Sequence, residues 1–322
     1  MATDVEHRTV PVEGGRIHLV EQGSGPVVLL VHGFPESWYS WRHQLPALAE
    51  AGYRAVAVDV RGYGLSSKPA AIDEYRLVRL VADNVGVLDA LGAESATIVG
   101  HDWGSPIAWT SALLRPDRFR ALVTLSVPYA APGPTRPTDA FRRLGGDEEF
   151  YISYFQEPGR AEAEIEEDVR SWLRGFYITA SGDAPPPTDG TMATVRPGGK
   201  LKDRFAQPDE LPAWLTEEDL DFYVGEFERT GFTGPLNRYR CVDHDWHDLA
   251  AFSRRPITVP SLFVGGELDG PTVWGGGAIA RFGETLPDLR GSHILPGCGH
   301  WVQQERAGDI NRLLLGFLTE VG

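Results

Sequence analysis

Apolar and polar residues alternate along the first 130 residues in a pattern that predicts strands and helices in turn. One helix is expected where apolar residues recur at helical spacing from Leu77 to Leu88, and Gly92 supplies the usual stop. Strands that alternate with helices in this way form a parallel sheet covered on both faces. The apolar runs that predict the strands are 17–22, 26–33, 53–62, 95–102 and 120–128.

The pattern changes after Pro128. Acidic helical stretches such as 161–173 follow, together with a Pro/Gly-rich stretch over 181–199 that we interpret as a loop near an entrance. Two further strands within 259–269 and 291–300 and an amphipathic helix from Ile310 to Leu318 then restore the α/β pattern. We therefore expect an α/β core split by a helical cap domain, with the core at 1–130 and 253–322 and the cap at 131–252.

Composition narrows the class of protein. The chain has 322 residues, 42% of them apolar, and a formal net charge of −15, which argues against nucleic acid and anionic membranes as partners. The two cysteines, Cys241 and Cys298, do not suggest a disulfide framework. The first residues resemble no signal peptide, and no apolar run is long enough to cross a bilayer. We expect a cytoplasmic protein.

The segment Gly100-His101-Asp102-Trp103-Gly104 has the spacing of a nucleophile elbow, G-x-S-x-G, with an aspartate in the place of the serine. It lies between a predicted strand and a predicted helix with Pro106 in its first turn, the context that an elbow requires. Asp102 is thus the candidate nucleophile. The alternative is that Asp102 only caps the helix, because aspartate is a favoured capping residue.

Two backbone amides are candidates for an oxyanion hole. In hydrolases with such an elbow, one amide belongs to the residue after the nucleophile and the other to the loop after the third strand. Here these residues are Trp103 and Phe34, the latter in the turn "HGFP". An ordinary tight turn is the alternative for "HGFP".

The acid and the base of a triad are expected downstream of the nucleophile. Asp269 lies just beyond a predicted strand, and His300 follows the last one, so we expect Asp269 to orient His300. Glu267 is a rival for the acid. No acidic residue occurs in 126–133, after the preceding strand. The remaining histidines considered, for which hydrogen-bonding roles are expected, are His43, His244, His247 and His293.

As a set, these motifs resemble the epoxide hydrolases of the α/β-hydrolase fold, most closely the actinobacterial ones, from about Val27 to the C-terminus. The resemblance implies an eight-stranded, mostly parallel sheet. It also implies two cap tyrosines that donate to the epoxide oxygen: Tyr239 in "FTGPLNRYR", and Tyr154 in "FYISYFQEP", with Tyr151 as the alternative. The segments that carry it are "HGFPESWYSWRHQ", "DVRGYGLSSKP", "VGHDWG", "LDFYVGEFERTGFTGPLNRYR", "GGELD" and "GHWVQQE".

One of these segments, "DVRGYGLSS", is interpreted as a structural loop in which Asp59 and Arg61 form a local ion pair. Other residues are assigned to the substrate. Aromatic and apolar side chains beside the elbow predict a pocket for a lipophilic epoxide. The residues expected to line it are Phe34, Pro35, Trp38 and Trp103.

A carboxylate nucleophile displaces a leaving group from saturated carbon and forms an ester on its own side chain, which water activated by a histidine can hydrolyse. An epoxide opens to a basic alkoxide and needs a proton donor, and a phenol suits this role. We therefore expect an epoxide hydrolase that needs no metal and no cofactor, as a monomer or homodimer. The alternatives are a haloalkane dehalogenase, which shares the aspartate elbow, and a ligand-binding protein that has lost turnover.

Overall fold

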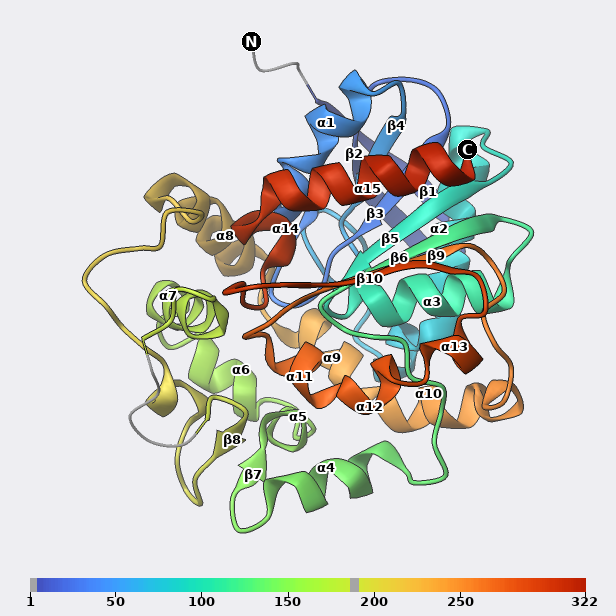
Figure 1. Ribbon diagram of the computed structural model, residues 1–322. Helices are drawn as coiled ribbons and strands as arrows, with labels where there is room; N and C mark the ends of the chain where they lie inside the picture. The colour runs from blue at the N-terminus through green and yellow to red at the C-terminus, as the bar shows by residue number, and fades with distance from the viewer. Residues whose placement is uncertain (1–4, 186–190) are drawn as a thin grey trace.

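The computed structural model describes residues 5–185 and 191–322, and an eight-stranded sheet forms its centre (Figure 1). The two N-terminal strands pair antiparallel with their neighbours, and the remaining pairs are parallel. Each of the predicted apolar runs overlaps one strand. In spatial order the strands are β1 (Glu6–Val12), β2 (Gly15–Gln22), β4 (Arg54–Val58), β3 (Val27–Val31), β5 (Ala96–His101), β6 (Phe119–Leu125), β9 (Ser261–Gly266) and β10 (Leu289–Leu295).

Side chains of the central strands alternate between two apolar cores, one on each face of the sheet. Leu29 of β3 belongs to the first core, and its neighbours Val28 and Leu30 belong to the second. The first core is covered by α2 (Leu77–Leu91) and α3 (Gly104–Leu114), and the second by α1 (Gln44–Glu50) and α15 (Ala307–Val321). Helix α2 ends as predicted at Gly92, whose φ is 66°. In the described ranges, no helix has the length and apolarity needed to cross a membrane.

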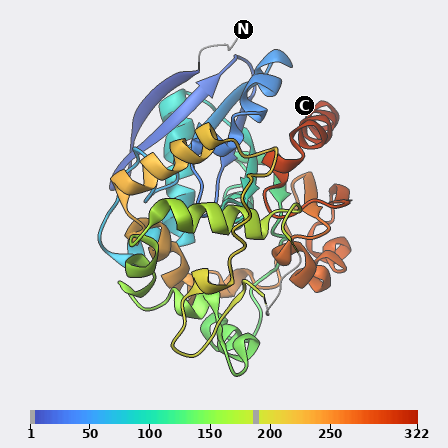
Figure 2. The same ribbon diagram turned by 90° about the vertical axis from the view of Figure 1, so that its left-hand side faces the viewer.

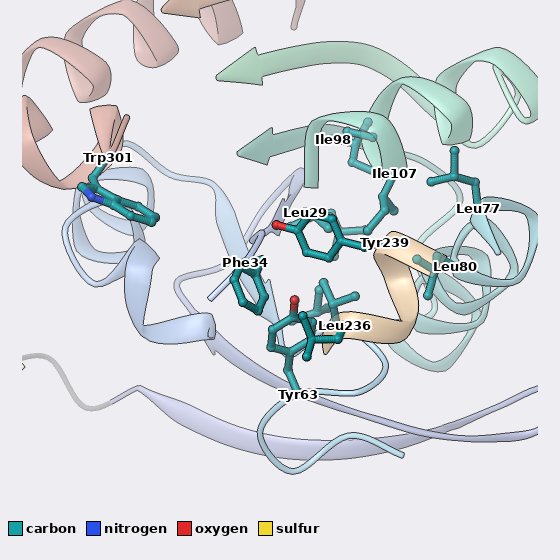
Figure 3. Packing of buried hydrophobic residues seen from close by; sticks show 14 of the residues in the cluster. Leu29, Phe34, Tyr63, Leu77, Leu80, Ile98, Ile107, Leu236, Tyr239 and Trp301 are labelled. Carbon is teal, nitrogen blue, oxygen red and sulfur yellow. The ribbon is translucent and has the colours of Figure 1, made fainter. Parts of the chain in front are cut away.

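A helical cap is inserted between β6 and β9, and in Figure 1 it lies to the left of the sheet and below it, on the side that faces the viewer in Figure 2. Its apolar residues continue the first core: Leu236 and Tyr239 pack near Phe34 in Figure 3. The boundaries at residues 130 and 252 stay a prediction, and residues 186–190 of the Pro/Gly-rich stretch lie outside the described residues. The elements are α4 (Pro137–Gly145), β7 (Glu149–Phe150), α5 (Tyr151–Tyr154), α6 (Arg160–Ile165), α7 (Val169–Ala180), β8 (Thr194–Val195), α8 (Glu217–Thr230), α9 (Thr233–Arg240) and α10 (Val242–Asp248).

The expected ion pair between Asp59 and Arg61 is wrong. The carboxylate of Asp59 lies 2.7 Å from Nδ1 of His18 on β2, whereas Arg61 pairs with Asp83 of α2, with 2.6 Å between Nη2 and Oδ1. Both side chains are buried, and each finds a partner on a different neighbouring element. The loop after β4 is therefore fixed to β2 by the hydrogen bond between Asp59 and His18, and to α2 by the ion pair between Arg61 and Asp83.

Candidate active site

The candidate residues of the core all lie on loops at the carboxyl ends of the parallel strands. Phe34 follows β3, Asp102 follows β5, Asp269 follows β9 and His300 follows β10. Because these strands are parallel, their carboxyl ends meet at one edge of the sheet, which faces the cap. A cavity of about 820 Å³ opens there, and its lining includes Asp102, His300, Tyr151, Tyr239 and Phe34.

The turn after β5 has the geometry of a nucleophile elbow. Asp102 has a φ of 50°, in the left-handed region that non-glycine residues rarely adopt. The two flanking glycines make this turn possible: a methyl group on Gly104 would lie 1.9 Å from the carbonyl oxygen of Val31, and one on Gly100 would lie 2.1 Å from the carbonyl oxygen of Gly104. Asp102 does not cap α3, because Trp103 holds that position and makes no capping bond with its side chain.

The carboxylate of Asp102 is bound at one oxygen. The backbone N–H of Phe34 donates to Oδ1 over 2.8 Å. The preceding Gly33 allows this approach, since a methyl group there would lie 2.3 Å from Oδ1 and 2.7 Å from the backbone nitrogen of Trp103. The amide of Phe34 thus binds the carboxylate, as one donor of an oxyanion hole would, and the second donor, the amide of Trp103, stays a prediction.

His300 lies between two carboxylates. Its Nδ1 is 2.8 Å from Oδ1 of Asp269, and its Nε2 is 3.6 Å from Oδ2 of Asp102. Glu267, the rival acid, instead accepts the backbone N–H of Gly297. Burial lowers the pKa of His300, but the two carboxylates outweigh burial and hold that pKa well above its usual value. Burial also raises the pKa of Asp102, yet His300 outweighs this effect and the net shift is downward. Both shifts favour the charged pair, a carboxylate beside an imidazolium.

A buried glutamate connects the three loops of the site. Glu36 accepts the backbone N–H of Gly33 over 3.0 Å and lies 2.7 Å from Nδ1 of His101. The other ring nitrogen of His101 lies 2.8 Å from the carbonyl oxygen of His300, and Gln303 donates to Glu36. The three loops that carry Phe34, Asp102 and His300 are thereby held together. None of these three polar residues has a role in the sequence-based prediction, although His101 lies within the elbow motif itself.

Two cap tyrosines reach the cavity, and one of them is Tyr151 rather than the predicted Tyr154. Tyr239 and Tyr151 line it, with their ring centroids 6.2 Å apart. Burial, followed by the charge of Asp102, raises the pKa of both phenols, so both remain protonated donors. Tyr154 does not reach the cavity, because its hydroxyl donates to the buried Glu164 over 2.6 Å. The expected placement of Tyr154 is therefore wrong, and the alternative, Tyr151, occupies the position.

Of the other expected substrate contacts, the structure brings only Phe34 to the cavity. The Trp38 ring packs edge-on against Phe222, and the carbonyl oxygen of Pro35 accepts the hydroxyl of Tyr177. The indole of Trp103 packs edge-on against Tyr239 at 5.0 Å between ring centroids, and it supports this tyrosine rather than lining the described cavity. Gly182, Ala184, Pro185 and residues 191–193, which flank the undescribed part of the Pro/Gly-rich stretch, do line it.

Comparison with known proteins places this arrangement in a family. The sequence model of the α/β hydrolase fold matches residues 26–307. Epoxide hydrolase B of Mycobacterium tuberculosis is 48% identical over 97% of this chain and 98% of its own length. The structure of an epoxide hydrolase from an endophytic Streptomyces is 65% identical, covers 98% of this chain and 95% of its own, and superposes with a TM-score of 0.96.

A second solved structure, that of epoxide hydrolase A from Mycobacterium thermoresistibile, is 45% identical over 98% of both chains, with a TM-score of 0.91. The agreement extends over the whole chain, cap included. The chain belongs to the epoxide hydrolases of the α/β-hydrolase fold family.

Proposed function

We propose that the protein converts lipophilic epoxides to vicinal diols through a covalent ester on Asp102. The observation that carries this proposal is the arrangement of the Asp102 carboxylate. Oδ1 is bound by the amide of Phe34, while Oδ2 faces His300 in a cavity that two protonated tyrosines also line. A nucleophile, a base and two acids for a leaving oxygen are thus gathered at one place.

In the first step, Oδ2 of Asp102 attacks one epoxide carbon and forms a C–O ester bond. The bond between that carbon and the ring oxygen breaks, and the ring oxygen keeps the electron pair. Tyr151 or Tyr239 transfers its phenolic proton to this oxygen, which gives the second hydroxyl of the product. Because Asp102 is now an ester, its negative charge no longer stabilises the imidazolium of His300. His300 then releases its Nε2 proton, which reaches the tyrosinate through solvent and restores the phenol.

In the second step, His300 takes a proton from water, and the resulting hydroxide adds to the ester carbon of Asp102. The amides of Phe34 and Trp103 stabilise the negative charge on Oδ1 of this intermediate. The bond from the ester carbon to the alkoxy oxygen then breaks, and His300 protonates that oxygen as the diol leaves. The carboxylic acid finally returns its proton to His300, so the imidazolium and the carboxylate are regenerated.

The cavity lining supports an apolar substrate larger than the epoxide itself. Phe176, Met192 and Leu201 line it from the cap, and Leu268 and Trp274 line it from the core. Trp274 is 55% exposed and its ring packs edge-on against Phe150 of the cap at 5.8 Å between centroids. An exposed indole at the border between core and cap suits the distal apolar part of a long substrate.

The variant His300→Gln tests this mechanism because it should form the ester without hydrolysing it. The variant is incubated with styrene oxide or with 1-bromohexane, and the intact protein is weighed. We expect a gain equal to the whole epoxide, located on the peptide that contains Asp102. A gain of only the hexyl group, from the bromide alone, would assign the site to dehalogenation instead. No adduct from these compounds or other epoxides would contradict covalent catalysis.

A further inference from the structure

We propose that Ser126 is a positioning residue for the hydrolysis of the ester, an inference that rests on the proposed function. Among the described residues, only two non-glycine residues have a positive φ: Asp102, at 50°, and Ser126, at 71°. The first is the nucleophile. Backbone strain of this kind concentrates at functional sites, where the surrounding structure holds it in place. The second strained residue also belongs to the site, although it lies at the end of a different strand.

The side chain of Ser126 closes a ring of hydrogen bonds with the acid and the base. Its hydroxyl donates to Oδ2 of Asp269 over 2.7 Å, and its Oγ lies 3.0 Å from Nδ1 of His300. The ring is closed by the 2.8 Å contact between Oδ1 of Asp269 and the same Nδ1. A carboxylate can only accept, so the serine proton points to Asp269 and a lone pair of Oγ faces the imidazole. Both neighbours of Nδ1 are therefore acceptors, and Nδ1 must carry the proton.

The backbone of Ser126 is anchored on two sides, which accounts for the left-handed conformation. Its N–H donates to the carbonyl oxygen of Val264 on β9 over 2.9 Å, and its own carbonyl oxygen accepts the hydroxyl of Thr272 over 2.8 Å. Thr272 belongs to α11 (Gly270–Trp274), the helix that Asp269 caps. The side chain of Ser126 is fully buried between these elements. The anchored backbone thus delivers the hydroxyl to the pair of Asp269 and His300 and to no substrate atom.

The ring matters most in the second step of the reaction. There, His300 must be neutral, with its proton on Nδ1 and a free electron pair on Nε2 to accept a proton from water. Asp269 keeps the backbone N–H of Thr272 as a donor when the serine hydroxyl is removed, so we expect a partial loss. For Ser126→Ala, the rate constant of ester hydrolysis should fall about tenfold, equivalent to about 1.4 kcal/mol. Ester formation does not need the base and should change less than about twofold.

The test is a single turnover of styrene oxide with enzyme in excess, quenched with acid, in which the mass of the Asp102 peptide is followed in time. Ser126→Ala and Ser126→Gly are compared with wild type and with Ser111→Ala. The control Ser111 is an equally buried serine whose hydroxyl donates within α3, to the carbonyl oxygen of Ile107. We expect the ester to decay about tenfold more slowly in both variants at position 126 and at the wild-type rate in the control.

The glycine variant separates the hydroxyl from the backbone, because glycine adopts a positive φ without strain. Wild-type decay in Ser126→Gly, or equal slowing of ester formation and decay, would overturn the inference. The NMR signal of the His300 Nδ1 proton gives a second readout: its exchange with water should accelerate in both variants, and an unchanged rate would contradict the ring. If wild type forms no ester at all, the proposed function fails instead, so the two failures are distinguishable.

Discussion

Tyr151 and Tyr154 lie three residues apart on α5, and they give opposite predictions when each is changed to phenylalanine. The substitution removes one hydroxyl and preserves the ring. In the catalytic cavity, Tyr151→Phe removes one of two acids for the leaving oxygen. General acid catalysis contributes about 10²–10⁴-fold, so we expect a loss of about ten- to a hundredfold for this single variant, since Tyr239 remains. The thermal unfolding temperature should hardly change.

Tyr154→Phe should leave catalysis intact and lower stability. The hydroxyl donates to Glu164, which also accepts the indole N–H of Trp172 and the backbone N–H of Leu201. Losing one bond to a charged group costs about 1.5–3 kcal/mol, and the remaining bonds favour the lower end. An effect of about 1.5 kcal/mol should lower the unfolding temperature by roughly 2 °C in a protein of this size.

The assay measures kcat/KM with styrene oxide together with thermal unfolding, for each single variant and for Tyr151→Phe combined with Tyr239→Phe. The double variant should lose the full contribution of the acid, about 10²–10⁴-fold. The reasoning is refuted if Tyr154→Phe loses activity while Tyr151→Phe keeps it. If the double variant forms diol at the wild-type rate, the tyrosines have no part in the mechanism.

Three further predictions concern the oxyanion hole, the charge of the base and the cavity mouth. Gly33→Ala places a methyl group 2.3 Å from Oδ1 of Asp102 and should reduce kcat about 10²–10³-fold in steady-state assays, whereas unchanged kcat would contradict the role of this approach. The pKa of His300 is raised in the folded protein, so wild type should be more stable than His300→Gln at about pH 6. Urea titrations should find that this difference in stability shrinks as the pH rises through the raised pKa, and a difference independent of pH would count against the ion pair. Trp274→Ala should raise KM about tenfold for epoxides with long alkyl chains and leave that for propylene oxide unchanged, and equal effects on both would exclude a contact with the distal part of the substrate.

The parts of the fold that local sterics determine were predictable from the sequence. The elbow is one example, because its close contacts leave room for glycine alone at positions 100 and 104. The buried strands were predictable for a different reason, since their apolar runs are continuous. Strand β1 was not predicted, because it lies at the edge of the sheet and Val10 is its single buried residue. A strand that buries almost nothing leaves little hydrophobic pattern to detect.

Polar partners were harder to predict, because they are chosen in three dimensions. The charges of Asp59 and Arg61 are two residues apart, yet each finds its partner on a neighbouring element. The cap tyrosine shows the same difficulty on a short helix. The backbone N–H of Tyr151 donates to Ala193, in the segment that lines the cavity, while Tyr154 meets Glu164 of α6. Sequence spacing alone could not assign these two hydroxyls, since both lie on one helix of four residues.

The charges of the site explain how one histidine can be an imidazolium at rest and a base during turnover. Asp269 and Asp102 both raise the pKa of His300, against the opposing effect of burial. In the proposed mechanism, formation of the ester neutralises Asp102 and removes one of these two charges, while Asp269 remains and keeps the ring oriented. Burial then opposes a single carboxylate, so we expect the pKa of His300 to fall once the epoxide has reacted, which favours loss of its proton at that point. On this proposal, the same carboxylate is the nucleophile of the first step and the electrostatic trigger for the second.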